Sequence, residues 1–407
     1  MTPFMHYSRK LLLSIFLCFS LVQCSDQANP EQADHIRILD EIPQHIQEVE
    51  NLTIFPGDSE PLYSIDLIQE QTYGQSGEAY LLRISKCVVD DKGRLIIWGS
   101  RSNYEQYIHV YNADGSYHTQ LGRRGRGPGE YEIVVGMQAE AGKVFVLDYT
   151  SQRLNEYSTQ DYSVIRSILI EQWDGGDEFR FGYVEPRNGG NYKVIFSENR
   201  SKFGRLEIKF QVMDHEGNSI SDKPLVFADG FRIKVRQSMQ PTMPLLFLGK
   251  TITALSDEDV LYVAWTRDFL IRKYDANYDY QSSFYYPIGG HPFDLNEYTK
   301  AQVFSPKAHD IENAFSNMDE DLPDTFPVID KLMVDDESRI WVAVPKGSQR
   351  EHYEWWILKE SGELLAKLLL PRDQPIYDIK NGYLFSKEIN EETGAGFVVK
   401  YRIELKE

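Results

Sequence analysis

The sequence predicts an all-β fold, a six-bladed β-propeller made of four-stranded antiparallel blades. One observation is a repeat: two apolar strands joined by a turn with Asp, Asn or Gly recur six times along the chain. A second is the period-two alternation of apolar residues after each copy, which supplies two more strands per unit. A third is the aromatic content of 13%, which favours pleated, half-buried surfaces over helices.

Residues 1–23 are predicted to be a signal peptide. Arg9 and Lys10 form a short basic region, and an apolar stretch from Leu11 to Val22 follows it. A helix that spans a membrane needs about 20 apolar residues, so this shorter stretch suits an export signal instead.

Cys24 follows this segment in the order Leu21-Val22-Gln23-Cys24. The order resembles a bacterial lipobox, in which the chain is cut before the Cys and the new N-terminal Cys is lipidated. The resemblance implies an outer-membrane lipoprotein, facing the periplasm or the cell surface and held through Cys24. Gln23 departs from the pattern, which has a small residue there, so an ordinary cleaved signal stays open as an alternative. Residues 24–50 are polar and acidic and are predicted to be a flexible tether.

Residues 51–407 are predicted to form the propeller. Three of the five intervals between repeats are near the roughly 40–50 residues of a four-stranded blade, and two are longer. The longer ones predict insertions at about 229–250, an irregular loop, and about 292–326, a helical segment with Asp294 and Glu297 at its start. Whether this helical insertion forms a partial lid or only covers an apolar patch stays open. The six repeats begin at Cys87, Met137, Val184, Ala254, Leu332 and Tyr377.

The closure of the ring is predicted from the sixth repeat. Its third strand, at Phe397–Leu405, is not followed by a fourth. An unpaired strand edge is a liability. The strand-like segment Pro61–Leu67, ahead of the first repeat, can fill this place, so we expect the two segments to pair within one blade.

A glycine-rich segment joins the first and second repeats, with the sequence Leu-Gly-Arg-Arg-Gly-Arg-Gly-Pro-Gly-Glu-Tyr from Leu121 to Tyr131. This segment, together with the stretch Leu332–Val342, is similar to six-bladed propeller lipoproteins of Bacteroidetes, and the blades resemble the NHL-repeat type. The likeness covers about residues 50–405. It implies the fold, and it implies no particular activity.

The glycines of this segment are expected where backbone geometry needs positive φ, Gly127 among them. A P-loop is excluded, because no Gly-Lys-Ser/Thr follows. The alternative is functional: Arg123, Arg124 and Arg126 are candidate residues for binding an anionic ligand or a protein partner, since guanidinium groups suit carboxylate and phosphate. Neighbouring Glu130 is the competing partner for one of these arginines.

The rest of the sequence contains no recognised catalytic or metal-binding motif. The chain has no His-Glu-x-x-His, Cys-x-x-Cys, EF-hand or Gly-x-Ser-x-Gly motif, so the sequence assigns no catalytic residue, metal ligand or cofactor. The pairs Asp90-Asp91 and Asp335-Asp336 fall in hairpin turns, where Asp caps its own backbone. Cys87 lies in an apolar strand and is expected to be a buried, inert thiol. The net charge of −19 argues against nucleic-acid binding.

The leading functional hypothesis is a non-enzymatic binding or scaffolding module on the cell envelope, for an unidentified ligand or protein partner. The alternative is a lactonase-like or lyase-like propeller enzyme with its site in the central channel. Three or more carboxylate or amide side chains that converge on one point of the channel would favour the enzyme. A third hypothesis, a structural partner in an outer-membrane complex, predicts a large exposed apolar patch.

Overall fold

The computed structural model describes residues 42–74, 81–102, 105–170, 173–198, 204–221, 223–234, 242–301, 308–316 and 322–407. The chain divides into two units, Met1–Glu48 and Val49–Glu407. The described part of the first unit contains one short helix, α2 (Gln44–Gln47), within the predicted tether. Cys24 and the predicted signal peptide lie outside the described residues. Within the described ranges, no helix is long and apolar enough to cross a membrane.

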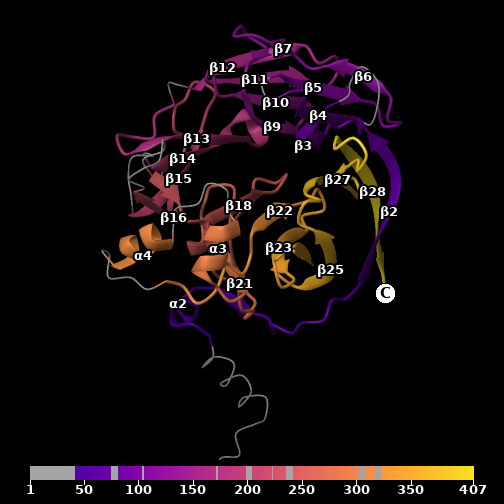
Figure 1. The fold of residues 1–407 in the computed structure, drawn as a ribbon. Helices are drawn as coiled ribbons and strands as arrows, with labels where there is room; N and C mark the ends of the chain where they lie inside the picture. Colours follow the sequence, from indigo (N-terminus) through magenta and orange to yellow (C-terminus); the bar gives the residue numbers. More distant parts are fainter. Residues whose placement is uncertain are drawn as a thin grey trace, which may run out of the picture. The chain divides into compact units, whose positions relative to one another are not determined.

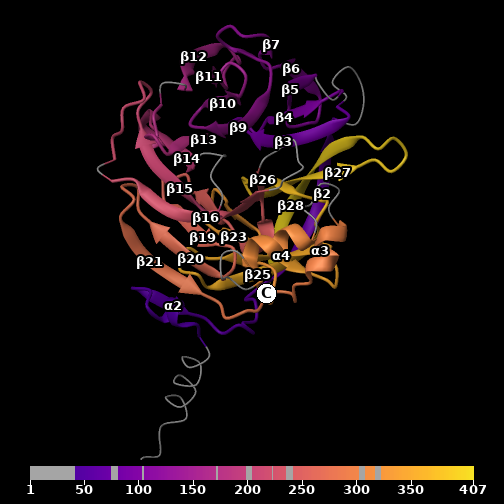
Figure 2. The same cartoon turned by 60° about the vertical axis from the view of Figure 1, so that its left-hand side comes forward.

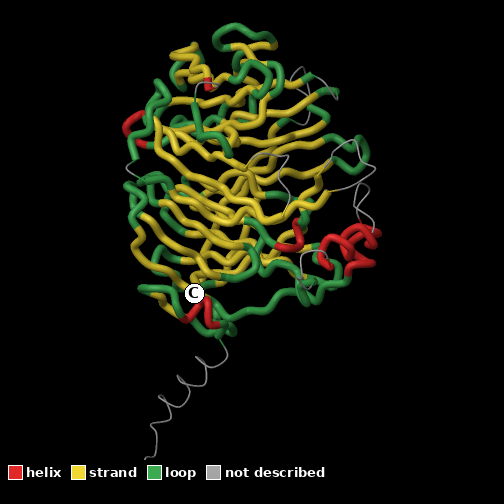
Figure 3. The backbone as a smooth tube through the Cα atoms, turned by 90° about the vertical axis from the view of Figure 1, so that its left-hand side faces the viewer, coloured by secondary structure: helices red, strands yellow, loops and turns green. Residues whose placement is uncertain are grey.

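Six sheets of mainly antiparallel strands make up the second unit, and each sheet is one blade (Figure 1). Figure 3 shows how far strands outnumber helices. The first blade consists of β3 (Arg83–Val89), β4 (Leu95–Ser100), β5 (Gln106–Tyr111) and β6 (Tyr117–Gln120). The second consists of β9 (Val134–Glu140), β10 (Lys143–Asp148), β11 (Arg153–Ser158) and β12 (Val164–Leu169). The third consists of β13 (Phe179–Pro186), β14 (Tyr192–Glu198), β15 (Gly204–Met213), β16 (Leu225–Lys234) and β17 (Thr242–Pro244).

The other three blades follow the same plan. The fourth consists of β18 (Thr251–Leu255), β19 (Leu261–Trp265), β20 (Leu270–Tyr274) and β21 (Tyr280–Tyr285), with β1 (Leu52–Ile54) added in parallel to β21. The fifth consists of β22 (Lys331–Val334), β23 (Ile340–Lys346), β24 (His352–Leu358) and β25 (Leu364–Pro371). The sixth consists of β26 (Ile376–Lys380), β27 (Tyr383–Ile389), β28 (Gly396–Lys406) and β2 (Ser64–Tyr73). The six-bladed propeller predicted from the repeats is confirmed.

The ring closes in the sixth blade, as the sequence predicted. Strand β2 pairs antiparallel with β28, from Ser64 opposite Lys406 to Tyr73 opposite Val398. In Figures 1 and 2 the two strands lie side by side although they come from opposite ends of the domain's sequence. In addition, β3 of the first blade contacts both β9 of the second and β26 of the sixth. The pairing of β2 with β28 removes the free strand edge that an open ring of blades would expose.

The apolar side chains gather at the seams between neighbouring blades, and each of the six seams holds one buried cluster. Between the first and second blades, for example, Val88 and Ile108 pack with Val134 and Val144. A four-stranded sheet cannot bury both of its faces alone, so the radial stacking of blades supplies the core.

The first insertion differs from the irregular loop predicted for residues 229–250. Strand β16 runs on to Lys234, and β17 pairs antiparallel with it, with Arg232 opposite Pro244. The physical reason is burial: Phe231 and Ile233 alternate inward on β16 and are covered by residues of the second insertion. The period-two pattern of this strand was hidden by the Met and Pro residues that follow it.

The second insertion contains two helices, α3 (Leu295–Ala301) and α4 (Ala308–Ser316), which lie next to each other in Figures 1 and 2. Asp294 begins α3, since its Oδ1 accepts a hydrogen bond of 2.8 Å from the backbone N of Glu297. The apolar faces of the helices pack on an aromatic cluster that includes Phe231 and Phe247. The helices therefore cover an apolar patch, and one of them also lines the pocket described below.

Candidate functional site

The glycine-rich segment between the first two blades is held largely by its own residues. Its two short strands, β7 (Arg123–Arg124) and β8 (Glu130–Tyr131), pair in parallel. Arg123 and Glu130 form an ion pair of 2.7 Å, and Arg126 and Glu132 form another of 2.8 Å. Backbone bonding from Gly127, and next the Arg123 side chain, lowers the pKa of the Glu130 carboxyl. Two of the three candidate arginines thus already have a carboxylate partner within the loop.

The expectation of positive φ at Gly127 is wrong. Positive φ occurs instead at Gly122, with φ of 59°, and at Gly129, with φ of 73°. A side chain at Gly122 would also come within 2.7 Å of the Tyr157 hydroxyl. The role of Gly127 is to donate its backbone N–H to Glu130 Oε2 at 2.8 Å.

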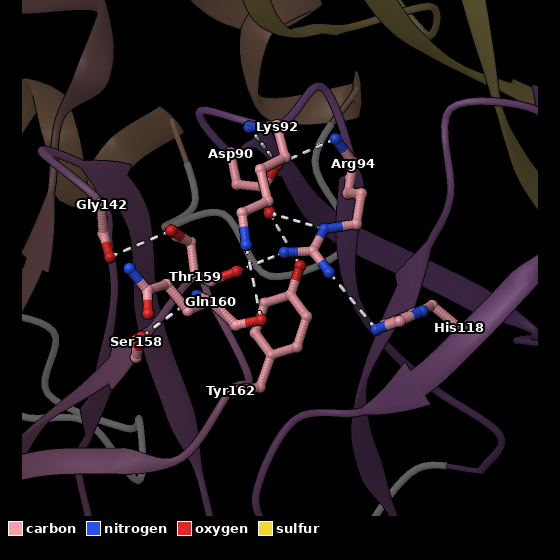
Figure 4. A network of polar contacts seen from close by, with 9 residues as sticks. All are labelled: Asp90, Lys92, Arg94, His118, Gly142, Ser158, Thr159, Gln160 and Tyr162. Atoms are coloured by element: carbon pink, nitrogen blue, oxygen red, sulfur yellow. Dashed lines mark hydrogen bonds and ion pairs between the residues drawn. The ribbon is translucent and has the colours of Figure 1, made fainter.

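One aspartate of each predicted pair, Asp90 and Asp335, caps the backbone of its own hairpin turn, as expected. Asp90 Oδ1 accepts hydrogen bonds from the backbone N of Lys92 at 2.9 Å and of Arg94 at 2.8 Å. Its other oxygen accepts from the Arg94 side chain at 3.1 Å and from the Tyr162 hydroxyl at 2.7 Å (Figure 4). Because Tyr162 comes from the second blade, this buried carboxylate also links two blades.

Asp335 repeats this arrangement in the fifth blade. Its Oδ1 accepts from the backbone N of Arg339 at 2.9 Å, and its Oδ2 accepts from Arg339 Nε at 2.7 Å and Trp341 Nε1 at 2.8 Å. Asp336 in turn accepts from the backbone N of Asn381 at 2.7 Å, which ties the fifth blade to the sixth. Bonds of this number and direction indicate a structural role for Asp90 and Asp335.

Cys87 is fully buried, and burial raises the pKa of its thiol well above the usual range. Nearby Asp378 contributes to this shift, and burial also raises the pKa of Asp378 itself. A thiol in this setting is held in its neutral form, so it is neither a good nucleophile nor a good metal ligand.

A polar cavity of about 180 Å³ lies at the mouth of the central channel, where the turns between the first two strands of each blade converge. Arg187 of the third blade pairs at 3.5 Å with Asp259 of the neighbouring fourth blade. Burial first, and then Asp257 and Asp259, raises the pKa of Glu140. In the described part of the chain, no three His, Cys, Asp or Glu side chains are placed to hold one metal ion. All six blades contribute charged residues to the lining, including Lys86, Glu140, Arg187, Asp257, Asp336 and Asp378.

A second and larger pocket, of about 490 Å³, lies between the fourth and fifth blades. We call it the rim pocket. Its lining comes from the turn between β23 and β24, from the segments that lead into β18 and β22, and from α3. Turns between second and third strands lie at the opposite strand ends from turns between first and second strands. The rim pocket and the channel mouth therefore lie at opposite ends of the blades.

Cationic and aromatic side chains dominate the rim pocket. The cations are Lys250, Arg350 and Arg372, with His291 beside them, and the carboxylates are Glu297 and Asp330. Phe247, Tyr298 and Phe326 form an aromatic wall. The lining residues extend over more than a hundred positions of the sequence, from Phe247 to Arg372, and no local motif marks them. The sequence therefore did not predict this site.

Asp330 is the carboxylate that interacts with the cations of this site. It accepts a hydrogen bond from Arg372 Nη2 at 2.8 Å, another from the Tyr353 hydroxyl, and it lies 3.9 Å from Lys250 Nζ. Burial acts to raise the pKa of Asp330, but the Tyr353 hydroxyl and the two cations outweigh it and hold the pKa below its usual range. Asp330 is thus ionised, and it engages two of the three cations.

Arg350 is the third cation and is held differently. Its Nε is buried and has no hydrogen-bond partner, and among the described residues no ion pair is formed by its guanidinium. The group lies 4.3 Å from the centre of the Phe326 ring. Burial first, and then the nearby Arg372, lowers the pKa of Arg350. Buried donors are nearly always satisfied in proteins, so the exception needs an explanation.

These blades, their seams and the closing strand define the protein as a six-bladed β-propeller. Residues 77–223 match the sequence model of a family described as a 6-bladed beta-propeller. No curated protein matches the chain in sequence.

Solved structures with a similar backbone arrangement share little sequence with this chain. A Bacteroides fragilis protein described as exported has 13% identity and a TM-score of 0.49, with 87% of this chain and 99% of that chain covered. The calcium-binding protein regucalcin of Agrobacterium tumefaciens has 10% identity and a TM-score of 0.39, with coverages of 86% and 96%. A virginiamycin B lyase of Staphylococcus aureus has 10% identity and a TM-score of 0.37, with coverages of 84% and 99%. Likeness at this level leaves activity and ligand open.

Proposed function

We propose that this protein is a lipid-anchored propeller of the cell envelope that binds a small ligand in the rim pocket. The observation that carries the binding role is Arg350, a half-buried cation whose Nε is buried and has no hydrogen-bond partner among the described residues, in a cavity that aromatic side chains also line. Small-molecule sites are concave, mostly apolar and furnished with a few directed polar groups. The rim pocket is concave and combines three aromatic side chains with a larger number of charged and polar ones.

The anchoring half of the proposal rests on the sequence. An export signal over residues 1–23, a lipobox-like end at Cys24 and a polar tether over residues 24–50 would place the propeller outside the inner membrane. A single acyl chain gives only marginal membrane binding, whereas several chains on one Cys give a stable anchor. The outer membrane, with the propeller in the periplasm or at the cell surface, is the location we propose.

The enzyme alternative has one observation in its favour, at the channel mouth. Burial and the neighbouring carboxylates of Asp257 and Asp259 raise the pKa of Glu140, and a raised carboxyl pKa is a common property of general acids. A lactonase-like or lyase-like propeller would use such a group in its channel. Hydrolysis of simple lactones by the wild type that is lost in Glu140→Gln would support this alternative.

The binding proposal is tested with a steric block. Gln349 lines the rim pocket in the turn between β23 and β24, and its side chain is exposed. Gln160 is an equally exposed glutamine in a turn of the second blade. We expect Gln349→Trp to abolish saturable binding of small ring compounds, measured by calorimetry on the detergent-solubilised full-length protein, and Gln160→Trp to leave it intact. Equal binding by both variants would contradict the rim pocket as the site.

A further inference from the structure

We infer that the ligand of the rim pocket is a small molecule with one acidic group attached to a ring, and that Arg350 binds the acidic group. This inference rests on the proposed function, because it concerns the same pocket, and it adds the chemical class of the ligand. Carboxylate, sulfate and phosphate share the required chemistry, a compact anion with two or more acceptor oxygens.

The charge of the pocket supports an anion. The lining contains three cations, Lys250, Arg350 and Arg372, and two carboxylates. Of the two carboxylates, Asp330 is the one that pairs with cations of the pocket among the described residues. Glu297 is exposed, in the first turn of α3. A guanidinium has five N–H donors in a planar fork, and the buried Nε–H of Arg350 has no hydrogen-bond partner among the described residues. An anion at Arg350 would satisfy this donor, which is costly to bury unpaired.

The backbone holds Arg350 in a set position. It occupies the end of a tight turn, where its N–H donates to the Gly347 carbonyl oxygen at 3.1 Å, and its own φ is 58°. Gly or Asn adopts that conformation more easily than Arg. Strain of this kind clusters at binding sites, where the surrounding structure fixes a side chain in advance. The turn thus presents a preorganised cation at the pocket.

The aromatic wall supports a ring next to the acid. Phe326 lies directly under the Arg350 guanidinium, and its ring centre is 5.0 Å from that of Phe293. Phe247 and Tyr298 meet edge to face at 4.8 Å on the same wall. Aromatic side chains that line a pocket favour aromatic or sugar rings as ligands, through stacked or edge-to-face contacts. A ring stacked here places its acidic substituent toward Arg350 and Arg372.

The volume limits the size of the ligand. A cavity of about 490 Å³ is within the range of roughly 300–1,000 Å³ that suits single small molecules. The occupant is therefore a compact compound of one or two rings with its acid at one end.

Calorimetry with defined probes tests the inference. The acids are benzoate, phenyl phosphate and glucuronate; the neutral counterparts are benzamide and glucose; and inorganic phosphate tests the anion without a ring. We expect at least one ring acid to bind saturably to the full-length protein. Its neutral counterpart and inorganic phosphate should each bind at least tenfold more weakly, and the binding of the acid should weaken with added salt.

Variants assign the effect to Arg350. We expect Arg350→Gln to weaken the binding of the acid at least tenfold and Arg350→Lys to weaken it less, because Lys keeps the charge but loses the planar fork. The matched control is Arg180→Gln in the third blade, an exposed arginine that donates only to backbone carbonyl oxygens. If Arg350→Gln does not fold, the Arg350→Lys variant and the salt dependence still decide the question.

The outcomes separate the two proposals. If the acids fail to bind at millimolar concentration, or bind equally to wild type and both Arg350 variants, the inference is overturned. If neutral ring compounds bind as well as the acids and Gln349→Trp blocks them, the ligand class is wrong but the binding function stands. If inorganic phosphate binds as tightly as phenyl phosphate, the ring half of the inference is wrong.

Discussion

The Arg350 guanidinium lies 4.3 Å from the centre of the Phe326 ring, and its buried Nε has no hydrogen-bond partner in the described part of the chain. A cation over an aromatic face is partly compensated for its lost water, typically by about 0.5–2 kcal/mol, but the ring replaces none of its hydrogen bonds. This pair brings together an aromatic wall and an unsatisfied cation, the two features on which the proposed binding site depends.

The lipid anchor gives the first prediction. Replacement Cys24→Ala removes the only acceptor for lipid in the lipobox-like sequence, so the variant should move from the membrane fraction to the soluble fraction on cell fractionation. The wild type should incorporate labelled fatty acid. If labelled fatty acid never enters the wild-type protein, Cys24 is not lipidated and the anchoring proposal fails.

Closure of the ring gives the second prediction. Leu67 on β2 packs into the seam between the fifth and sixth blades, whereas its neighbour Ile68 faces outward. We expect Leu67→Asp to lower the free energy of unfolding by about 2–4 kcal/mol, because it brings a charge into an apolar seam, and Ile68→Asp to change it by less than about 1 kcal/mol. Denaturant unfolding measures both. Equal stabilities would mean that the seam contributes little to the fold.

The turn aspartates give the third prediction, in which adjacent residues serve as test and control. Asp90 is buried and accepts bonds from Arg94 and Tyr162, while Asp91 is exposed in the same turn. Asp90→Ala leaves the Arg94 charge without its partner and should cost about 3–5 kcal/mol of stability. Asp91→Ala should cost less than about 1 kcal/mol. A small effect at Asp90, measured by thermal or denaturant unfolding, would show that the network in Figure 4 is not a main link between the blades.

Asp229 gives a prediction about pH. Burial raises its pKa to about 6 from a usual value of 3.8, against the opposing effects of Arg232 and Lys250. The folded state therefore binds this proton more tightly than the unfolded state. The stabilising contribution is complete below the unfolded pKa and is lost as the pH rises through the folded pKa.

The variant Asp229→Asn cannot ionise and isolates this effect. It should be about as stable as the wild type near pH 4 and more stable at pH 8, by about 1–3 kcal/mol. Unfolding of both proteins over this pH range gives the difference directly. A difference that does not vary with pH would rule out titration of Asp229 as its cause.

The arginines of the glycine-rich segment give the fifth prediction. Arg123 and Arg126 form exposed ion pairs, which contribute about 0–1 kcal/mol each, so changing Arg123, Arg124 and Arg126 together to Gln should leave the protein folded. If this segment binds an anionic partner, the triple variant should lose that partner, most clearly at low salt. Unfolding of the triple variant would instead assign the arginines a structural role.

The sequence predicted the propeller well because its blades are local. Each hairpin, such as the one from Cys87 to Trp98, is recognisable from the alternation of apolar residues and from its turn residue. Its strands pair with neighbours in the sequence, so no contact between distant segments has to be predicted. The closing strand was found because β28 would otherwise have a free edge, but its true length, from Ser64 to Tyr73, exceeds the apolar segment that marked it. Polar residues such as Gln69 and Gln71 continue the strand because one face of it is exposed.

The rim pocket could not be predicted in the same way. Lys250, Arg350 and Arg372 belong to three separate loops, and the packing of the fourth blade against the fifth brings them together. The glycine-rich segment drew attention because its arginines are close in sequence, yet two of them pair with nearby glutamates. Charged residues that are close in the sequence can form ion pairs with one another, as Arg123 and Arg126 do with nearby glutamates. Arg350, whose Nε has no partner among the described residues, lies in a turn that no sequence pattern marks.

A crystal structure of the protein with bound phenyl phosphate is the most direct measurement of the central claim. The account predicts the phosphate within hydrogen-bond distance of Arg350 and Arg372 and the phenyl ring against the wall that contains Phe326. A phenyl phosphate molecule bound in the channel mouth or at the arginines of the glycine-rich segment, with the rim pocket empty, would contradict it.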